Sequence, residues 1–161
     1  MSQPSNAQPE APARLPYLRA IDPLPLQSAE HNRLHLFYAA LADGRLTTTR
    51  CARCGRVDWP PRAFCPSCTS DAVEWIDLPR EGHVHGFTVQ ETGVPPGFAR
   101  PLVFAIVAVA GLRIFAPLVG VPDPARLAVG ALVRFAPVRV ADGPQGEPRH
   151  LLAFSPVEPA S

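Results

Sequence analysis

The sequence contains no lysine, so all 15 of its basic residues are arginines, and 14 acidic residues nearly balance them. With a formal net charge of +1, the chain lacks the broad positive surface typical of nucleic-acid-binding proteins. Cysteine is confined to one stretch, and the first residues lack the basic and then apolar pattern of a secretory signal. We therefore expect a cytoplasmic protein with reduced thiols and no disulfide framework.

Long helical patterns are also scarce, and 21 prolines predict turns, sheet edges and extended connectors. One mostly apolar run, residues 102–121, is about as long as a membrane span. It contains Gly111, Arg113 and Pro117 and is rich in β-branched residues, so we interpret it as two paired strands and expect no membrane association. A chain of 161 residues holds one ordinary domain or one small module attached to another.

All four cysteines lie within residues 51–68, which read CARCGRVDWPPRAFCPSC. They form two CxxC pairs, Cys51/Cys54 and Cys65/Cys68, separated by ten residues. Each pair can present two thiolates from one tight turn, and two such turns can face each other across a tetrahedral metal. The stretch therefore predicts a zinc ribbon with these four cysteines as ligands.

Other roles for the cysteine pairs are less consistent with the sequence. A redox site usually has one CxxC pair at the start of a helix, and disulfides belong to an oxidising compartment. Iron takes the same four-sulfur ligand set and stays an alternative to zinc. Four thiolates leave no open coordination position, so the metal is predicted to hold structure and not to activate water.

The chain before the cysteines divides into two segments. Residues 1–27 are rich in proline and largely lack periodicity, which predicts a disordered or extended arm. Residues 28–44 predict an amphipathic helix that Ser28 caps and that ends at Asp43 and Gly44. Its apolar residues recur at helical spacing, at Leu34, Phe37, Tyr38 and Leu41. This aromatic stripe is expected to pack in the core, with contact to another subunit as the alternative.

The chain from residue 45 onward is predicted to be β. Residues 45–79 form the zinc ribbon, and residues 80–161 hold five strands separated by Gly/Pro loops. The five strands are predicted at residues 83–92, 102–109, 113–119, 132–140 and 151–157. Five strands with the main irregular connection after the third are typical of an OB-fold barrel, so the predicted fold class is mainly β. The barrel phenylalanines are expected in its core, at Phe87, Phe104, Phe115 and Phe135.

Several segments together resemble one protein family. They are FYAALADGRLTTTRCARCGRVDWPPRAFCPSC, VEWIDLPREGHVHGFTV, PLVFAIVAVAGLRIFAPLVGV and LAVGALVRF. The chain is similar in these segments to the DUF35 family, in which a rubredoxin-like zinc ribbon precedes an acyl-CoA-associated OB-fold domain. The resemblance covers roughly residues 30–140, and its most specific parts are the four cysteines, the Pro60-Pro61-Arg62 sequence between them and Trp75.

The resemblance implies a non-catalytic accessory subunit of a thiolase-fold enzyme that acts on CoA thioesters, such as a thiolase or an aldolase. The partner would carry the catalytic residues, and the chain itself shows no nucleophile and base in a motif context, so we do not expect it to be an enzyme alone. It would scaffold the complex and help to enclose CoA. In the loop at residues 93–101, Phe98 would cover the pantetheine and Arg100 would face phosphate. Arg62, in the arginine cluster beside the metal, is a further candidate to bind CoA.

A function of a different class is a single-stranded nucleic-acid-binding module, because zinc ribbons and OB-folds both bind single strands. That function expects basic residues and exposed aromatic side chains along one barrel face. The nearly neutral charge and the expected core positions of the phenylalanines favour the accessory subunit instead.

Overall fold

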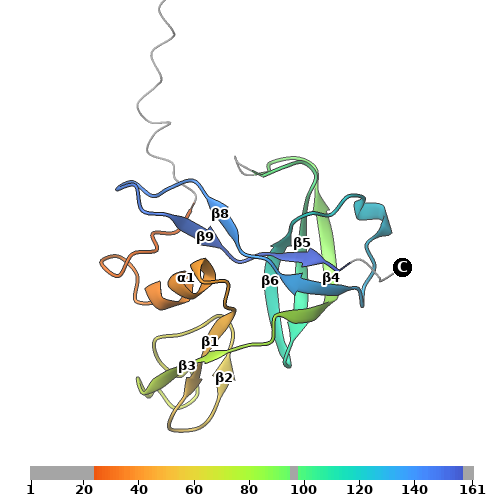
Figure 1. Cartoon of the computed structure of the whole chain (residues 1–161). Coiled ribbons are helices and arrows are strands. Elements are labelled where there is room, and N and C mark those ends of the chain that lie inside the picture. The colour runs from red at the N-terminus through yellow and green to blue at the C-terminus, as the bar shows by residue number, and fades with distance from the viewer. Residues whose placement is uncertain (1–23, 95–97, 158–161) are drawn as a thin grey trace, which may run out of the picture.

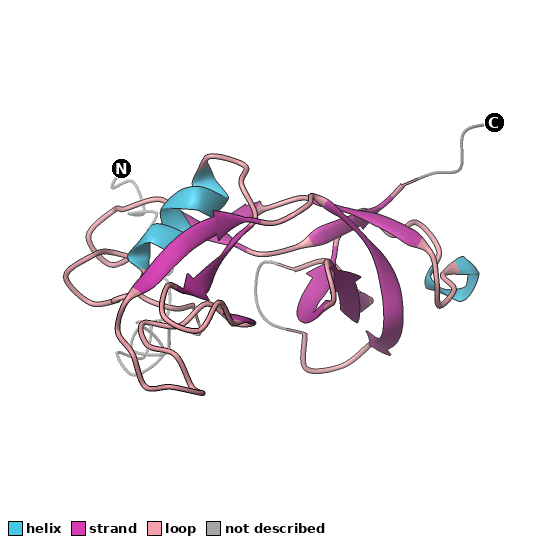
Figure 2. Cartoon of the chain, turned by 90° about the horizontal axis from the view of Figure 1, so that it is seen from below, coloured by secondary structure: helices cyan, strands magenta, loops and turns pink. Residues whose placement is uncertain are grey.

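The structure is a computed structural model that describes residues 24–94 and 98–157 (Figure 1). Most of the predicted N-terminal arm therefore lies outside the described residues. The described chain forms a three-stranded sheet, a closed five-stranded barrel and a two-stranded sheet, together with helix α1 and the short 3-10 helix η2. Figure 2 shows α1 and the three-stranded sheet at one end and the barrel at the other. The predicted mainly β fold class is confirmed.

Helix α1 spans His35–Ala42 and is shorter than the predicted helix. The Ser28 carbonyl accepts a hydrogen bond from the Asn32 N–H at 2.9 Å, but this turn does not continue into α1. Instead, the Asn32 carboxamide oxygen accepts a hydrogen bond from the Leu34 N–H at 2.8 Å. An asparagine side chain that binds backbone in this way stops a helix from extending toward the N-terminus. The predicted start at Ser28 is therefore wrong.

The apolar face of α1 packs into the core, as the sequence predicts. Phe37 and Leu41 are buried, and the Phe37 ring meets the Trp59 ring edge-on with centroids 5.8 Å apart. Tyr38 packs against the same core. The helix thus covers the ribbon with its aromatic residues, and Leu36 is the large apolar side chain that it leaves exposed.

The three-stranded sheet is the ribbon. It is made by β1, β2 and β3, which span Thr47–Cys51, Val57–Asp58 and Val73–Asp77. Strand β1 is central in the order β2-β1-β3 and pairs antiparallel with both neighbours. Its threonines are buried, and two of them bind backbone: the Thr48 hydroxyl donates to the Asp58 carbonyl at 2.6 Å, and Thr49 Oγ1 accepts from the Arg62 N–H at 2.9 Å. These bonds fix the loop that leads to the second cysteine pair.

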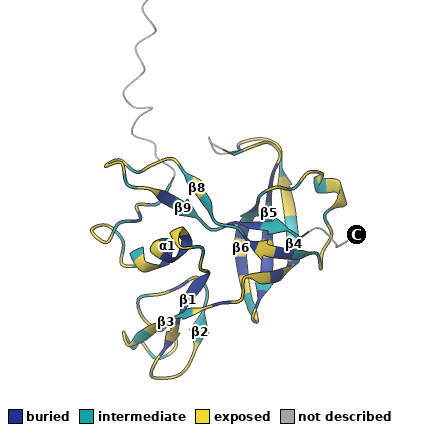
Figure 3. Ribbon diagram, viewed as in Figure 1, coloured by how far each residue is buried: buried dark blue, intermediate teal, exposed yellow. Residues whose placement is uncertain are grey.

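The barrel closes in the order β10-β6-β5-β4-β7. Its strands span Glu81–Gln90 (β4), Leu102–Val109 (β5), Leu112–Leu118 (β6), Leu132–Phe135 (β7) and Phe154–Pro156 (β10). Strands β4, β5 and β6 form a continuous antiparallel meander. Buried residues line the barrel interior, as Figure 3 shows. The predicted five-stranded barrel is confirmed.

The predicted fourth strand, residues 132–140, is two strands. Strand β7 ends at Phe135, and β8 (Val138–Val140) leaves the barrel to pair with β9 (Arg149–Leu151). Pro137 lies between β7 and β8, and a proline cannot donate the backbone hydrogen bond that would continue the ladder. The fifth barrel strand is also shorter than predicted, because β10 begins only at Phe154.

The β8–β9 hairpin extends from the barrel to α1 (Figure 1). The side-chain amide of Gln27 donates to the His150 carbonyl at 2.7 Å and accepts from the His150 N–H at 2.9 Å. Arg149 is fully buried, and its guanidinium donates to the carbonyls of Ala141 and Asp142. The hairpin therefore ties the segment before the helix to the C-terminal part of the fold.

Two of the four barrel phenylalanines predicted to lie in the core lie on the outer face of the barrel. Phe135 is buried and Phe87 packs against the core, but Phe104 and Phe115 stack on each other with centroids 5.2 Å apart and rings 10° from parallel. Phe115 is 62% exposed. The core prediction is wrong for this pair because both strands carry apolar residues on both faces, so the sequence does not show which face turns inward.

Within the two described ranges, no helix is long and apolar enough to cross a membrane.

We predict that Gln27→Ala lowers the free energy of unfolding by about 1–3 kcal/mol, because a buried amide that makes two backbone hydrogen bonds is removed. Urea denaturation of the full chain measures this change. Gln145→Ala is the control, since the Gln145 side chain is exposed and the residue donates its hydrogen bond to Glu147 through the backbone N–H, which alanine keeps. Equal unfolding midpoints for the two variants would contradict the role of Gln27.

Candidate metal centre

The four cysteine sulfurs converge between two facing turns of the ribbon. All four lie within 4.8 Å of one another, with the Cys51 and Cys68 sulfurs 3.6 Å apart and the Cys54 and Cys65 sulfurs 3.6 Å apart. A tetrahedral site with metal–sulfur bonds of about 2.3 Å has sulfur–sulfur edges of about 3.8 Å. The observed spacing therefore fits a four-thiolate metal site, and the four predicted ligands come together.

The two turns are built alike. In the first, the Cys51 carbonyl accepts from the Gly55 N–H at 2.9 Å; in the second, the Cys65 carbonyl accepts from the Thr69 N–H at 3.0 Å. Gly55 and Thr69 both have positive φ angles, of 74° and 58°. Glycine adopts this conformation freely, whereas a β-branched residue is strained in it.

Hydrogen bonds from backbone N–H groups favour the thiolate form of two of the cysteines. The Cys68 N–H lowers the pKa of the Cys65 thiol to about 7, and the Cys54 N–H lowers the pKa of the Cys51 thiol in the same way. The Arg56 N–H acts to lower the pKa of Cys54, but hydrogen bonds with Cys65 and Cys51 outweigh it and raise that pKa to about 12. Without a metal, the cluster thus retains a proton that a metal must displace.

Most arginines around the metal centre are already paired with acids. Arg56 meets Asp58 at 2.8 Å and donates to the Ser67 hydroxyl, and further ion pairs of 2.9 Å join Arg50 to Glu74 and Arg45 to Asp77. All three pairs have exposed arginines, so each contributes little to stability. They nevertheless reduce the positive charge that the cluster offers to a phosphate.

The three residues predicted to bind CoA lie in two places. Arg62 is exposed on the ribbon, between the cysteine pairs. Phe98 and Arg100 lie on the connection from β4 to β5, half-buried and exposed respectively, and residues 95–97 of that connection are outside the described chain. Figure 1 shows the ribbon and this connection at opposite ends of the molecule. The structure therefore does not bring Arg62 together with the other two.

Two family models match adjacent stretches of the chain, which together span residues 39–139. The rubredoxin-like zinc ribbon domain of ChsH2 matches residues 39–74, and the C-terminal OB-fold domain of ChsH2 matches residues 75–139. This chain belongs to the ChsH2 (DUF35) family. The match places the four converging sulfurs in the zinc ribbon of the family and strands β4 to β7 of the barrel in its OB-fold domain.

Relatives and solved structures agree with this assignment. The chain is 36% identical over 103 residues to the benzoylsuccinyl-CoA thiolase subunit BbsA of Thauera aromatica, covering 58% of this chain and 71% of BbsA. The Ltp2-ChsH2(DUF35) aldolase contains a chain that is 28% identical and superimposes with a TM-score of 0.65, covering 78% of this chain and 95% of that one. A DUF35 protein of unknown function from Sulfolobus solfataricus, at 17% identity and a TM-score of 0.50 over 76% of this chain and 83% of its own, shares the fold.

We predict that Cys54→Ser lowers the zinc content of the purified chain and its thermal unfolding midpoint, because three thiolates hold the ion less tightly than four. Elemental analysis and calorimetry measure the two effects. Ala52→Ser is the control, since it adds the same hydroxyl to the exposed part of the same turn without changing a ligand. Full zinc content in Cys54→Ser would exclude Cys54 as a ligand.

We also predict that apparent zinc affinity falls as the pH is lowered from about 8 to about 6, because protons compete with the metal for the sulfurs. The Cys65 thiol, with a pKa of about 7, regains its proton in this interval, and Cys54 holds its proton throughout in the metal-free state. Competition with a chromophoric chelator at each pH gives the affinity. A flat profile would show that the thiols are not the ligands.

Proposed function

We propose that this chain is a non-catalytic accessory subunit of a thiolase-fold enzyme that acts on CoA thioesters. The observation that carries the proposal is the likeness to two proteins whose names describe such assemblies, a thiolase subunit and an aldolase complex. All four cysteines of the chain form the four-sulfur site, so a bound metal would have no open position for catalysis. The reaction is therefore assigned to the partner.

The outer face of β5 and β6 is the surface we assign to this partner. Apart from Arg113 on β6, its side chains are mainly apolar. Phe104 and Ile106 on β5 face outward beside Phe115 on β6, which pairs with Ile106 across the two strands. A strand that is apolar on both faces is typical of one buried on both sides. In the chain alone the inner face is buried, whereas Ile106 is 39% and Phe115 is 62% exposed. A partner subunit would cover the outer face.

This placement differs from the expectation drawn from the sequence, in which the helix at residues 28–41 and the ribbon dock on the partner. Phe37 of α1 is buried against Trp59, and Tyr38 is half-buried against the same core, so the helix offers a partner little aromatic surface. Leu36 on α1 and Phe64 on the ribbon remain exposed and can extend the contact.

We further propose that the β4–β5 connection helps the partner to enclose CoA. Arg100 and Phe98 stand just before β5, whose outward-facing Phe104 begins the docking face. A guanidinium binds phosphate oxygens in charge-assisted hydrogen bonds, and an aromatic ring covers the apolar part of pantetheine. Arg62 lies on the ribbon, away from this connection, so the proposal rests on Phe98 and Arg100.

One observation favours a second candidate, binding of single-stranded nucleic acid. The stacked Phe104 and Phe115 lie on the second and third barrel strands, a face that OB-folds use for oligonucleotides. Arg113 is the charged residue that β6 adds to this face. Because the backbone of nucleic acid makes such binding strongly salt-dependent, a labelled oligonucleotide that binds at low salt and dissociates at high salt would support this candidate.

The docking face is tested by co-expression with a thiolase-fold protein taken from the gene neighbourhood of this chain. We predict a stable hetero-oligomer, and Phe115→Ser is expected to weaken it by at least about ten-fold, as for a central aromatic residue of an interface. Val129→Ser is the control, since Val129 is equally exposed, at 66%, but lies outside β5 and β6. A chain that stays monomeric beside its neighbour would overturn the proposed function.

The CoA contact has its own test in the complex. Arg100→Ala is predicted to raise the KM for the CoA thioester by about ten-fold with little change in kcat, because a ground-state phosphate contact is lost. Arg139→Ala, an exposed arginine of β8, is the control. Unchanged KM in an intact complex would remove Arg100 from the CoA site while leaving the accessory role in place.

A further inference from the structure

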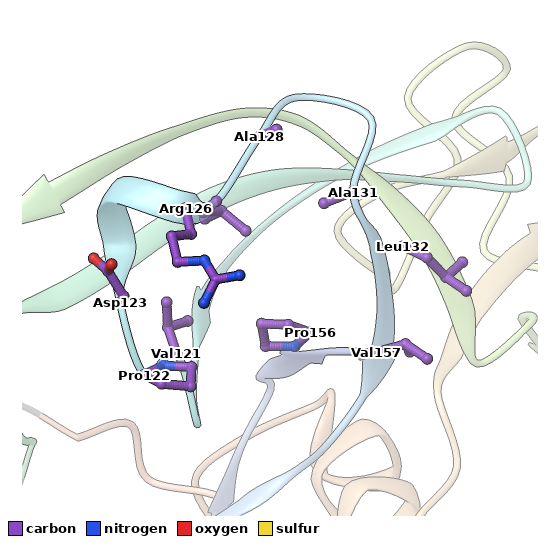
Figure 4. A pocket seen from close by; sticks show the side chains of 10 residues that line it. Val121, Pro122, Asp123, Arg126, Ala128, Ala131, Leu132, Pro156 and Val157 are labelled. Atoms are coloured by element: carbon purple, nitrogen blue, oxygen red, sulfur yellow. The ribbon is translucent and has the colours of Figure 1, made fainter. Parts of the chain in front are cut away.

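The barrel has a cavity of about 490 Å³ at the end that carries η2 (Pro124–Arg126) (Figure 4). This end lies away from the ribbon and from α1 (Figure 1). None of the residues considered above for the metal, the docking face or CoA lines it. The volume is within the range of about 300–1,000 Å³ that is usual for ligand sites in proteins.

The cavity forms because β6 and β10 pair only briefly. Phe154 and Leu118 are paired, and the last bond between the two segments runs from the Val119 N–H to the Phe154 carbonyl at 2.8 Å. The chain then turns away at Gly120, which has a φ of 66°. Val121 and Pro122 on one side are thus separated from Pro156 and Val157 on the other, and the space between them opens to the surface.

Backbone hydrogen bonds hold both walls in place. The Asp123 carboxylate accepts from the Ala125 N–H at 2.9 Å and caps η2. Farther along, the Gly130 N–H donates to the Val84 carbonyl at 2.7 Å, and the Val157 N–H donates to the Leu132 carbonyl at 3.0 Å. A site whose walls are fixed before a ligand arrives loses little conformational entropy on binding.

The lining is apolar except for one pair of charged residues. Val121, Leu127 and Ala131 pack against the barrel core and form the inner wall. Figure 4 shows the Arg126 side chain reaching from η2 into the space toward Pro156. The Asp123 carboxylate is engaged with the backbone of η2, and among the described residues no acidic side chain forms an ion pair with Arg126. The cavity therefore offers an apolar wall and one available positive charge.

We propose that this cavity binds a small aliphatic carboxylate, with its chain against Val121, Leu127 and Ala131 and its carboxylate on Arg126. An apolar chain gains free energy by leaving water for such a wall. A guanidinium pairs with a carboxylate through two parallel hydrogen bonds, which fixes the orientation of the chain. The inference goes beyond the proposed accessory function, because it concerns a site on the chain itself and needs no partner subunit.

A segment of a partner protein is the other occupant that an open apolar cavity can take. Such a segment would need an acidic residue beside an aliphatic one to match the same charge and wall. We favour the small carboxylate because the apolar side chains, the single cation and the fixed walls surround a volume of ligand size.

The test uses the full zinc-loaded chain and octanoate as the probe, with octan-1-ol and butyrate as matched compounds. Binding is followed by changes in amide NMR signals and by calorimetry. We expect saturable binding of octanoate with shifts confined to the non-proline residues of 121–132 and to Val157, and weaker binding of both matched compounds. Arg126→Gln is expected to weaken octanoate binding by about five-fold, as for loss of one partly exposed charge pair.

Two variants complete the test. Arg113→Gln removes an exposed arginine from the outer face of β6 and is expected to leave octanoate binding unchanged. Ala131→Leu places a larger side chain on the inner wall of the cavity and is expected to abolish octanoate binding. Calorimetry checks that this variant still folds. If it does not fold, Arg126→Gln serves as the test, because Arg126 is exposed and its replacement leaves the fold intact.

Three results would overturn the proposal. The first is no saturable binding of octanoate to the wild-type chain. The second is equal binding of octanoate and octan-1-ol with no effect of Arg126→Gln, which would show an apolar surface without selectivity for an anion. The third is loss of the hetero-oligomer in Arg126→Gln while octanoate fails to bind, which would assign the cavity to the partner subunit.

Discussion

The arrangement of the molecule depends on a junction with almost no free linker. The Leu78 N–H donates to the Leu46 carbonyl at 2.8 Å as the chain leaves the ribbon, and the Phe135 N–H donates to the Arg80 carbonyl at 2.6 Å as it enters the barrel. Only Pro79 stands between these two bonded residues. Leu46 and Leu78 also belong to the core cluster that includes the barrel interior and the buried face of α1. The ribbon, the helix and the barrel are thereby held in one arrangement.

The parts of the fold that the sequence predicts are those encoded by local pattern. The spacing of the two CxxC pairs specifies the metal turns, and β5 begins and ends at the predicted residues 102 and 109. Both features depend on short stretches whose side chains decide their own conformation. The helix start is predicted wrongly at Ser28, because the hydrogen bond from the Leu34 N–H to the Asn32 side chain holds the chain outside the helix up to Leu34.

The features that the sequence does not reveal depend on contacts between distant segments. Phe104 and Phe115 lie in runs that are apolar at nearly every position, so alternation gives no sign of which residues face outward. The cavity beside η2 is lined by two segments more than twenty residues apart, and neither has a recognisable motif. The exchange of hydrogen bonds between Gln27 and His150 joins residues 123 positions apart. Such contacts are set by the closed barrel and by the hairpin that leaves it.

The two metal turns are alike in geometry but differ at one corresponding residue. Gly55 and Thr69 occupy the same place after the second cysteine of each pair, and only glycine takes that conformation without strain. The first turn can therefore keep its shape without a metal, whereas the second is held in a conformation that threonine by itself disfavours. Metal loss would consequently release the two turns unequally. The turn at Cys65 and Cys68 would open before the turn at Cys51 and Cys54, which is joined to the central strand β1.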